Sequence, residues 1–173
     1  CHCATPASIV CTGYFSRIPE TSPLVNIFVC PPATDADNSI RSRDGKKLLD
    51  GGVCDSIPIR KFQSMGYARN IVVLTQYGGY RKQKSASLPL IRARYHAYPR
   101  FVEKMEDRHL RYNDTLDLLN EEEKKGNVLI IRPKKPVNIS RLEKNVEKLQ
   151  ALYDEGYADT AGMIQDIRAF LAG

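Results

Sequence analysis

Two short apolar runs rich in β-branched residues set the strongest limit on how this chain can fold. Ile71–Thr75 and Val128–Ile131 have the length and composition of buried strands in a parallel sheet. Neighbouring parallel strands need a long connection, which is usually helical, and the residues between these runs carry a helical pattern. The sequence therefore predicts the α/β class with a mostly parallel sheet.

The helical pattern between the runs is an apolar stripe along residues 98–119, with side chains recurring every three or four positions. It predicts one long helix from about Pro99 to the residues before Gly126. His109 lies on this stripe, which favours a hydrogen-bonded core histidine over a ligand. The preceding residues 76–89 are polar and basic, and a loop is expected there.

Shorter helices are expected on either side. Pro58 and Gly66 have the positions of a first-turn proline and a helix stop, which predicts a helix over about 57–65. Ser140 and Glu143 have the spacing of a capping box, so a helix is expected from there to Gly156, followed by a last helix over about 159–171. The apolar side chains of the first of these two helices are expected to face inward: Leu142, Val146, Leu149 and Tyr153.

Composition and charge exclude several protein classes. No apolar run in the 173 residues approaches the roughly 18 that a membrane span needs. The formal charge of +6 comes entirely from residues 44–173, but no arginine-rich helix or stacking-aromatic motif accompanies it, so nucleic-acid binding is not expected. The odd, front-loaded set of five cysteines favours reduced thiols and a cytoplasmic location. Cys1-His2-Cys3 is interpreted as an accident of the terminus, and no metal or cofactor is expected.

The chain divides into two zones. Residues 1–43 show no sustained periodicity, and only Leu24–Val29 resembles a strand. From residue 44 onward the segments have clear signatures, beginning with a strand at Lys46–Leu49 that leads into Asp50-Gly51-Gly52. We therefore expect a leader segment over 1–43 and a separate domain over 44–173.

The Asp-Gly-Gly segment is the first candidate site. Ligands in open α/β sheets bind beyond the carboxyl ends of the strands, and Asp50 follows a predicted strand directly. By itself Asp-Gly-Gly is common turn chemistry. Asp55 is interpreted as a cap of the helix at Pro58, and Cys54 as a residue that fills space.

The residues around this turn resemble a known family. Leu49-Asp50-Gly51-Gly52 followed by Asp55-Ser56-Ile57-Pro58 resembles the second catalytic motif of the patatin-like phospholipases. Further segments, in the same order, are similar to a bacterial branch of that family over about residues 44–173: Asn70–Thr75, Gly79–Lys82, Tyr98-Pro99, Arg111–Asn113 and Ile131–Pro133.

The resemblance implies a partial patatin-like three-layer fold with a C-terminal helical extension, and a serine–aspartate dyad acyl hydrolase that cleaves phospholipid or lysophospholipid esters without a cofactor. It assigns Asp50 as the base partner of the serine, and a carboxylate near a hydroxyl can take its proton. Gly51 and Gly52 would form the sharp turn behind Asp50. Arg81 and Lys82 are candidate contacts for a phosphate head group, with peripheral membrane contact.

The chain departs from the family pattern at the nucleophile. No G-x-S-x-G occurs in the sequence, and the glycine-rich oxyanion loop is absent as well. We therefore expect a fragment that carries only the aspartate half of the site and has no activity of its own. Residues 1–43 are expected to be a foreign or frame-shifted leader. The alternative is a non-catalytic basic α/β module that associates with anionic membrane surfaces or with a protein partner.

Overall fold

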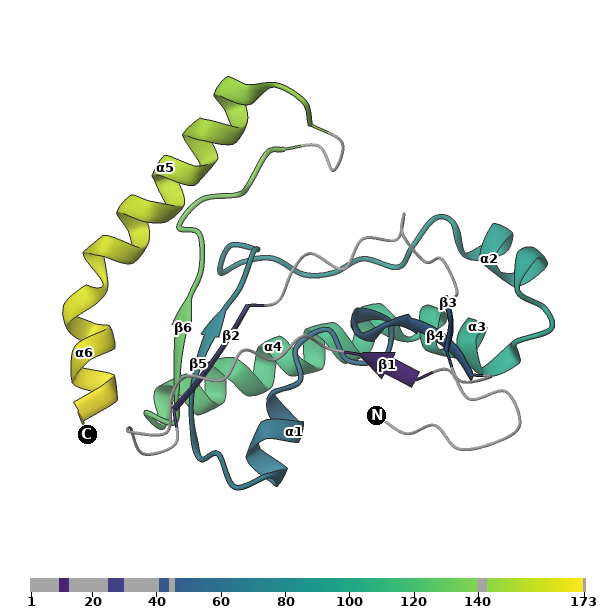
Figure 1. Cartoon of the computed structure of the whole chain (residues 1–173), viewed down its shortest axis with the longest axis horizontal. Coiled ribbons are helices and arrows are strands. Elements are labelled where there is room, and N and C mark those ends of the chain that lie inside the picture. The colour runs from purple at the N-terminus through teal and green to yellow at the C-terminus, as the bar shows by residue number, and fades with distance from the viewer. Residues whose placement is uncertain (1–9, 13–24, 30–40, 44–45, 140–142, 173) are drawn as a thin grey trace. The chain divides into compact units, whose positions relative to one another are not determined.

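Parallel strands pair in two separate three-stranded sheets (Figure 1). The computed structural model describes residues 10–12, 25–29, 41–43, 46–139 and 143–172, and its contacts divide the chain into two units. The first unit includes residues 33–61 and 81–120 with strand β1, and the second includes residues 62–80 and 121–173 with strand β2. The mixture of helices and parallel strands confirms the α/β class.

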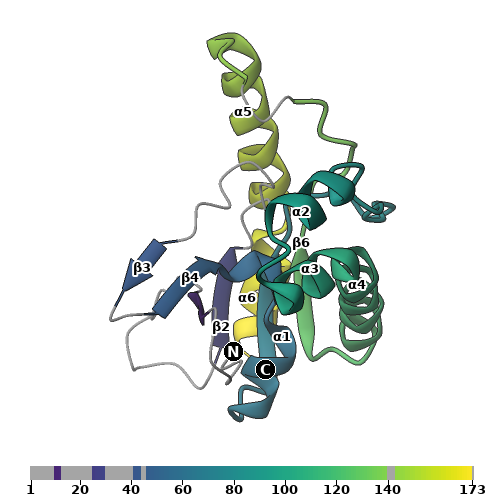
Figure 2. The same ribbon diagram turned by 90° about the vertical axis from the view of Figure 1, so that its right-hand side faces the viewer.

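The sheet of the first unit has the order β1-β4-β3, with bounds Val10–Thr12, Lys46–Asp50 and Arg41–Arg43 (Figure 2). Strand β4 runs parallel to β1 and antiparallel to β3. The register pairs Arg43 with Lys46, so only Asp44 and Gly45 connect β3 to β4, and this dipeptide is strongly typical of two-residue hairpins. The parallel register places Asp50 beside Thr12, at the carboxyl ends of β4 and β1.

Short helices build the core of the first unit. These are α2 (Leu88–Arg94), α3 (Pro99–Glu106) and most of α4 (Arg108–Lys124), together with the first turn of α1 (Ile59–Ser64). The ring of Tyr95 meets that of Phe101 edge-on, with 4.9 Å between the ring centres. Tyr95 thereby packs against a buried apolar cluster, which consists of Val53, Leu88, Phe101 and Met105.

The sheet of the second unit is entirely parallel, in the order β2-β5-β6, with bounds Val25–Val29, Arg69–Val73 and Val128–Ile131. The central strand β5 buries Asn70, Ile71 and Val72 in succession, as expected for a strand covered on both faces. Strand β6 buries alternate residues instead, because only one of its faces is fully covered. Figure 1 shows the three strands side by side.

The second unit ends in two consecutive helices, α5 (Val146–Gly162) and α6 (Ile164–Ala172), which follow one another with a bend in both views (Figures 1 and 2). Asn145 caps α5, and its side-chain oxygen accepts a hydrogen bond from the Lys148 amide. The Arg69 guanidinium attaches α6 to the start of β5, because it donates to the Phe170 carbonyl and stacks 4.3 Å from the centre of the Phe170 ring.

Several predicted strands and helices are confirmed. Strand β6 has the predicted bounds, β2 corresponds to the strand predicted at Leu24–Val29, and α1 lies within the predicted helix over 57–65. Strand β5 begins two residues before the predicted Ile71 and ends two residues before Thr75. The boundary predicted at residue 43 stays a prediction, since most of residues 1–43 fall outside the described ranges.

Other predictions were wrong. The single long helix is two helices that meet at Asp107, and α2 occupies part of the segment expected to be loop. Helix α5 begins at Val146 instead of near Ser140, which lies outside the described residues, and it continues through Gly156. Its apolar side chains do not face inward, since Val146 is 75% exposed and Tyr153 is 67% exposed.

One buried carboxylate connects α1 to the end of α4 in the second unit. The Oε1 atom of Glu122 accepts from Lys125 Nζ at 2.7 Å, while Oε2 accepts from Asn127 Nδ2 at 2.9 Å and from Gln63 Nε2 at 3.1 Å. Glu122 is only 8% exposed. The bonds from Lys125 and Asn127 lower the pKa of Glu122 below its ordinary value of 4.5.

Replacing Glu122 with alanine should lower the free energy of unfolding by about 2 kcal/mol near neutral pH, because the amides of Gln63 and Asn127 lose their common acceptor. The exposed neighbour Glu121→Ala is the control, with an expected change below about 0.5 kcal/mol. Since the folded state lowers the pKa of Glu122, its stabilisation is present above pH 4.5 and is lost as the pH falls through the lowered value. Urea unfolding followed by circular dichroism tests this, and equal losses in both variants would contradict it.

Candidate functional site

The candidate site begins where β4 ends. Asp50 is the last residue of β4, and the 3₁₀ turn η2 (Gly51–Val53) follows it directly. This position, at the carboxyl end of a strand with a parallel neighbour, is where α/β sheets bind ligands. The side chain of Asp50 lies outside the described part of the structure, so its assignment as a base stays a prediction.

Two arginines of α4 hold the turn by its backbone. The Gly52 carbonyl accepts hydrogen bonds from Arg108 Nε at 3.0 Å and from Ser56 Oγ at 2.7 Å. The next carbonyl, that of Val53, accepts from Arg111 Nη2 at 3.4 Å, and the same nitrogen donates to the Lys104 carbonyl at 2.5 Å. Arg108 is only 5% exposed. Buried charge-assisted hydrogen bonds therefore fix the turn that follows Asp50.

Asp55 shapes the segment between this turn and α1. Its carboxylate accepts a hydrogen bond from the Ile57 amide, two residues before α1 begins at Ile59. Asp55 therefore forms a side-chain turn and does not cap the helix as the sequence predicts. Burial raises the pKa of Asp55, although the Ile57 amide, Arg60 and Arg111 partly oppose this shift. A partly buried carboxyl group with a perturbed pKa is a marker of functional sites.

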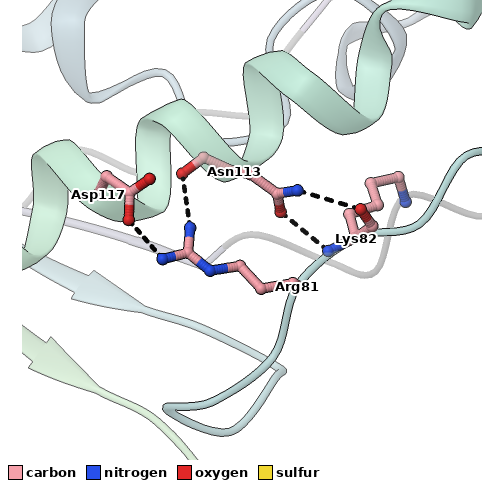
Figure 3. Close-up of polar contacts among 4 residues, drawn as sticks. All are labelled: Arg81, Lys82, Asn113 and Asp117. Carbon is pink, nitrogen blue, oxygen red and sulfur yellow. Dashed lines mark hydrogen bonds and ion pairs between the residues drawn. The ribbon is translucent and has the colours of Figure 1, made fainter.

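Arg81 and Lys82 attach their loop to α4 (Figure 3). Arg81 donates to Asp117 Oδ1 at 2.5 Å and to the Asn113 carbonyl at 3.2 Å. The Asn113 side chain accepts from the Lys82 amide at 2.9 Å and donates to the Lys82 carbonyl at 3.1 Å. The proposed phosphate head-group contact of these residues stays a prediction, and the Arg81 guanidinium already has a carboxylate partner.

The arginines that hold the turn were missed by the sequence analysis. Met105 follows Phe101 by four residues and Arg108 follows Met105 by three, so Arg108 continues their buried stripe. A basic residue at such a position signals a guanidinium with buried acceptors. His109 was predicted to be a hydrogen-bonded core histidine, and the structure does not show this at its Nδ1 atom. Its Nδ1 atom is buried but has no hydrogen-bond partner among the described residues.

Within the described ranges, no three His, Cys, Asp or Glu side chains gather closely enough to hold a metal ion, and Cys1-His2-Cys3 falls outside those ranges. In the part of the chain that the structure describes, no helix has the length and apolar character needed to cross a membrane.

Comparison with known proteins gives one match. Residues 98–172, which include α3 to α6 and β6, match the model of a family described as a domain of unknown function, DUF6363. No curated protein and no solved structure matches the chain significantly. The Asp50 turn lies before the matched residues, while Arg108 and Arg111 lie within them.

Replacing Arg108 with methionine should destabilise the protein by about 2 kcal/mol, because the Gly52 carbonyl loses a charged donor in a buried position. The matched control is Arg100→Met on α3, where the side chain is exposed and the expected change is below about 0.5 kcal/mol. Urea unfolding measures the stability, and hydrogen exchange of the amides at residues 53–57 reports on the turn. Unchanged exchange in Arg108→Met would show that the turn holds without this arginine.

Proposed function

We propose that this chain carries the aspartate half of a serine–aspartate dyad acyl hydrolase of the patatin-like type, which acts on carboxylic esters of lipids. The main support is the position of Asp50, which ends a strand paired in parallel with β1 and enters a Gly-Gly turn. Arg108 and Arg111 hold the carbonyls of this turn. The ordered series of segments similar to the family supports the same proposal, including its three-layer fold.

In the proposed reaction, Asp50 acts as the base. The serine hydroxyl attacks the ester carbonyl carbon, and the Asp50 carboxylate takes the hydroxyl proton. The bond from carbon to the leaving oxygen then breaks, and the alcohol departs with that proton. Water, again deprotonated by Asp50, hydrolyses the acyl-serine and restores both groups. Since G-x-S-x-G does not occur in this sequence, the serine must come from a segment outside it.

A second candidate is a non-catalytic basic module that binds anionic membrane surfaces or a protein partner. The excess of positive charge in residues 44–173 supports it, together with the absence of the nucleophile motif from the sequence. The two proposals differ in what Asp50 does, because only the hydrolase requires its carboxylate.

The 173-residue chain alone should not hydrolyse esters, because it has a candidate base and no activated nucleophile. Incubation with a short-chain p-nitrophenyl ester should give the rate of buffer alone, and a fluorophosphonate probe should leave the serines unlabelled. Stoichiometric labelling of one serine, with turnover, would identify a nucleophile within the chain and contradict the proposed division of the site.

Asp50→Asn should abolish most turnover in a restored enzyme, made by joining residues 44–173 to a nucleophile half from a similar protein. The amide has nearly the shape of the carboxylate but cannot take the proton, so a loss of about 10²–10⁴-fold in kcat is expected. Asp107→Asn, an exposed aspartate between α3 and α4, is the matched control and should keep its turnover.

Asp55→Asn separates the two aspartates of the motif. Asparagine keeps an oxygen that can accept the Ile57 hydrogen bond, so the turn should survive. If Asp55→Asn abolishes turnover while Asp50→Asn keeps it, the base has been assigned to the wrong residue. If neither substitution changes turnover, the dyad proposal fails and the non-catalytic module is favoured.

A further inference from the structure

A pocket of about 280 Å³ opens beside the Asp50 turn, entirely within the first unit. Residues 53–57 form one side of it, Arg60 of α1 contributes a second, and α4 forms the third with Arg108, Arg111 and Thr115. This volume is slightly below that of sites for drug-sized molecules, so it suits a small polar group. Among the described residues, neither Arg81 nor Lys82, the candidate head-group contacts of the sequence analysis, lines the pocket.

Guanidinium groups dominate the charge of the pocket. Among the described residues that line it, three carry guanidinium groups and two, Asp55 and Asp114, carry carboxylates. The guanidinium groups come from two different helices, α1 and α4, so they approach the pocket from different directions. The described lining residues therefore carry more positive than negative groups, which favours an anion over a cation.

One donor in this pocket lacks an acceptor. The Nε atom of Arg111 is buried and has no hydrogen-bond partner among the described residues, while Nη2 of the same guanidinium bonds the carbonyls of Val53 and Lys104. A buried donor of this kind is costly to leave unsatisfied. The exposed Arg60 adds a guanidinium that needs no rearrangement of the turn to reach a ligand.

From this arrangement we infer that the pocket binds a phosphate group, carried either by a lipid head group or by a free phosphate ester. Phosphate presents acceptor oxygens in several directions, which suits guanidinium groups that converge from two helices, and arginine recognises it through planar, paired donors. The inference does not rest on the proposed hydrolysis, since it concerns binding and is measured without turnover.

The test uses the 173-residue chain and measures binding of inorganic phosphate and of glycerol 3-phosphate by titration calorimetry, with glycerol as the uncharged comparison. Arg60→Gln should weaken the binding of both phosphates about tenfold, because a charged donor is lost. Asp55→Asn should strengthen binding about threefold or more, because the competing carboxylate is removed. The matched control is Arg100→Gln, which removes the same charge from an exposed position on α3 and should leave the affinity unchanged.

Vesicles of phosphatidylcholine, with and without phosphatidic acid, distinguish the two sources of phosphate. A chain of net charge +6 is attracted to anionic vesicles in any case. Binding to these vesicles is therefore assigned to the pocket only if Arg60→Gln weakens it and Arg100→Gln does not. Such a loss identifies a head-group site, while pocket-dependent binding of the free phosphates alone identifies a soluble phosphate ester. The inference is overturned if neither phosphate binds with a Kd below about 10 mM. It is also overturned if Arg60→Gln and Arg100→Gln bind the phosphates with the same affinity. Circular dichroism confirms that each variant is folded.

Discussion

The hydrogen bond from the buried Arg108 guanidinium to the Gly52 carbonyl positions most of what is chemically distinctive in the first unit. A guanidinium that is nearly removed from water needs fixed acceptors, and the carbonyls of a short 3₁₀ turn have few partners of their own. Each group therefore satisfies the other. Because a movement of the turn would break this hydrogen bond, the bond also helps to hold the Asp55 segment that follows the turn.

Helix α4 has more than one role in this arrangement. Arg108 and Arg111 face the Gly-Gly turn, while Asn113 and Asp117, further along the same helix, hold the backbone of Lys82 and the side chain of Arg81. Arg108, Arg111 and Asn113 bond backbone groups, and Asp117 pairs with the charged side chain of Arg81. A helix that binds two loops in this way needs polar side chains at those positions, so it lacks a clean apolar stripe throughout its length.

The sequence predicted best the elements whose limits are marked by a change in chemistry. Strand β6 lies between Asn127 and Arg132, so its apolar run and its hydrogen-bonded length coincide. Strand β5 begins with Arg69 and Asn70, whose polar side chains conceal the start of the strand, although Asn70 is fully buried. The break at Asp107 left no periodic signal, because Arg108 continues the stripe of α3.

For the site, the motif located Asp50 and its turn. The arginines that hold the turn come from more than fifty residues away, and a local sequence pattern carries no information over that distance.

Each unit is assembled from three separate stretches of the chain, which alternate along the sequence. No single proteolytic cut can therefore release one unit intact, and no contiguous truncation keeps one core while removing the other. During synthesis, β5 leaves the ribosome more than fifty residues before β6, the strand that completes its pairing. Until then its buried-strand sequence presents an unpaired edge, which makes the nascent chain, more than the finished protein, the form most exposed to misassembly and the one for which chaperone binding matters most.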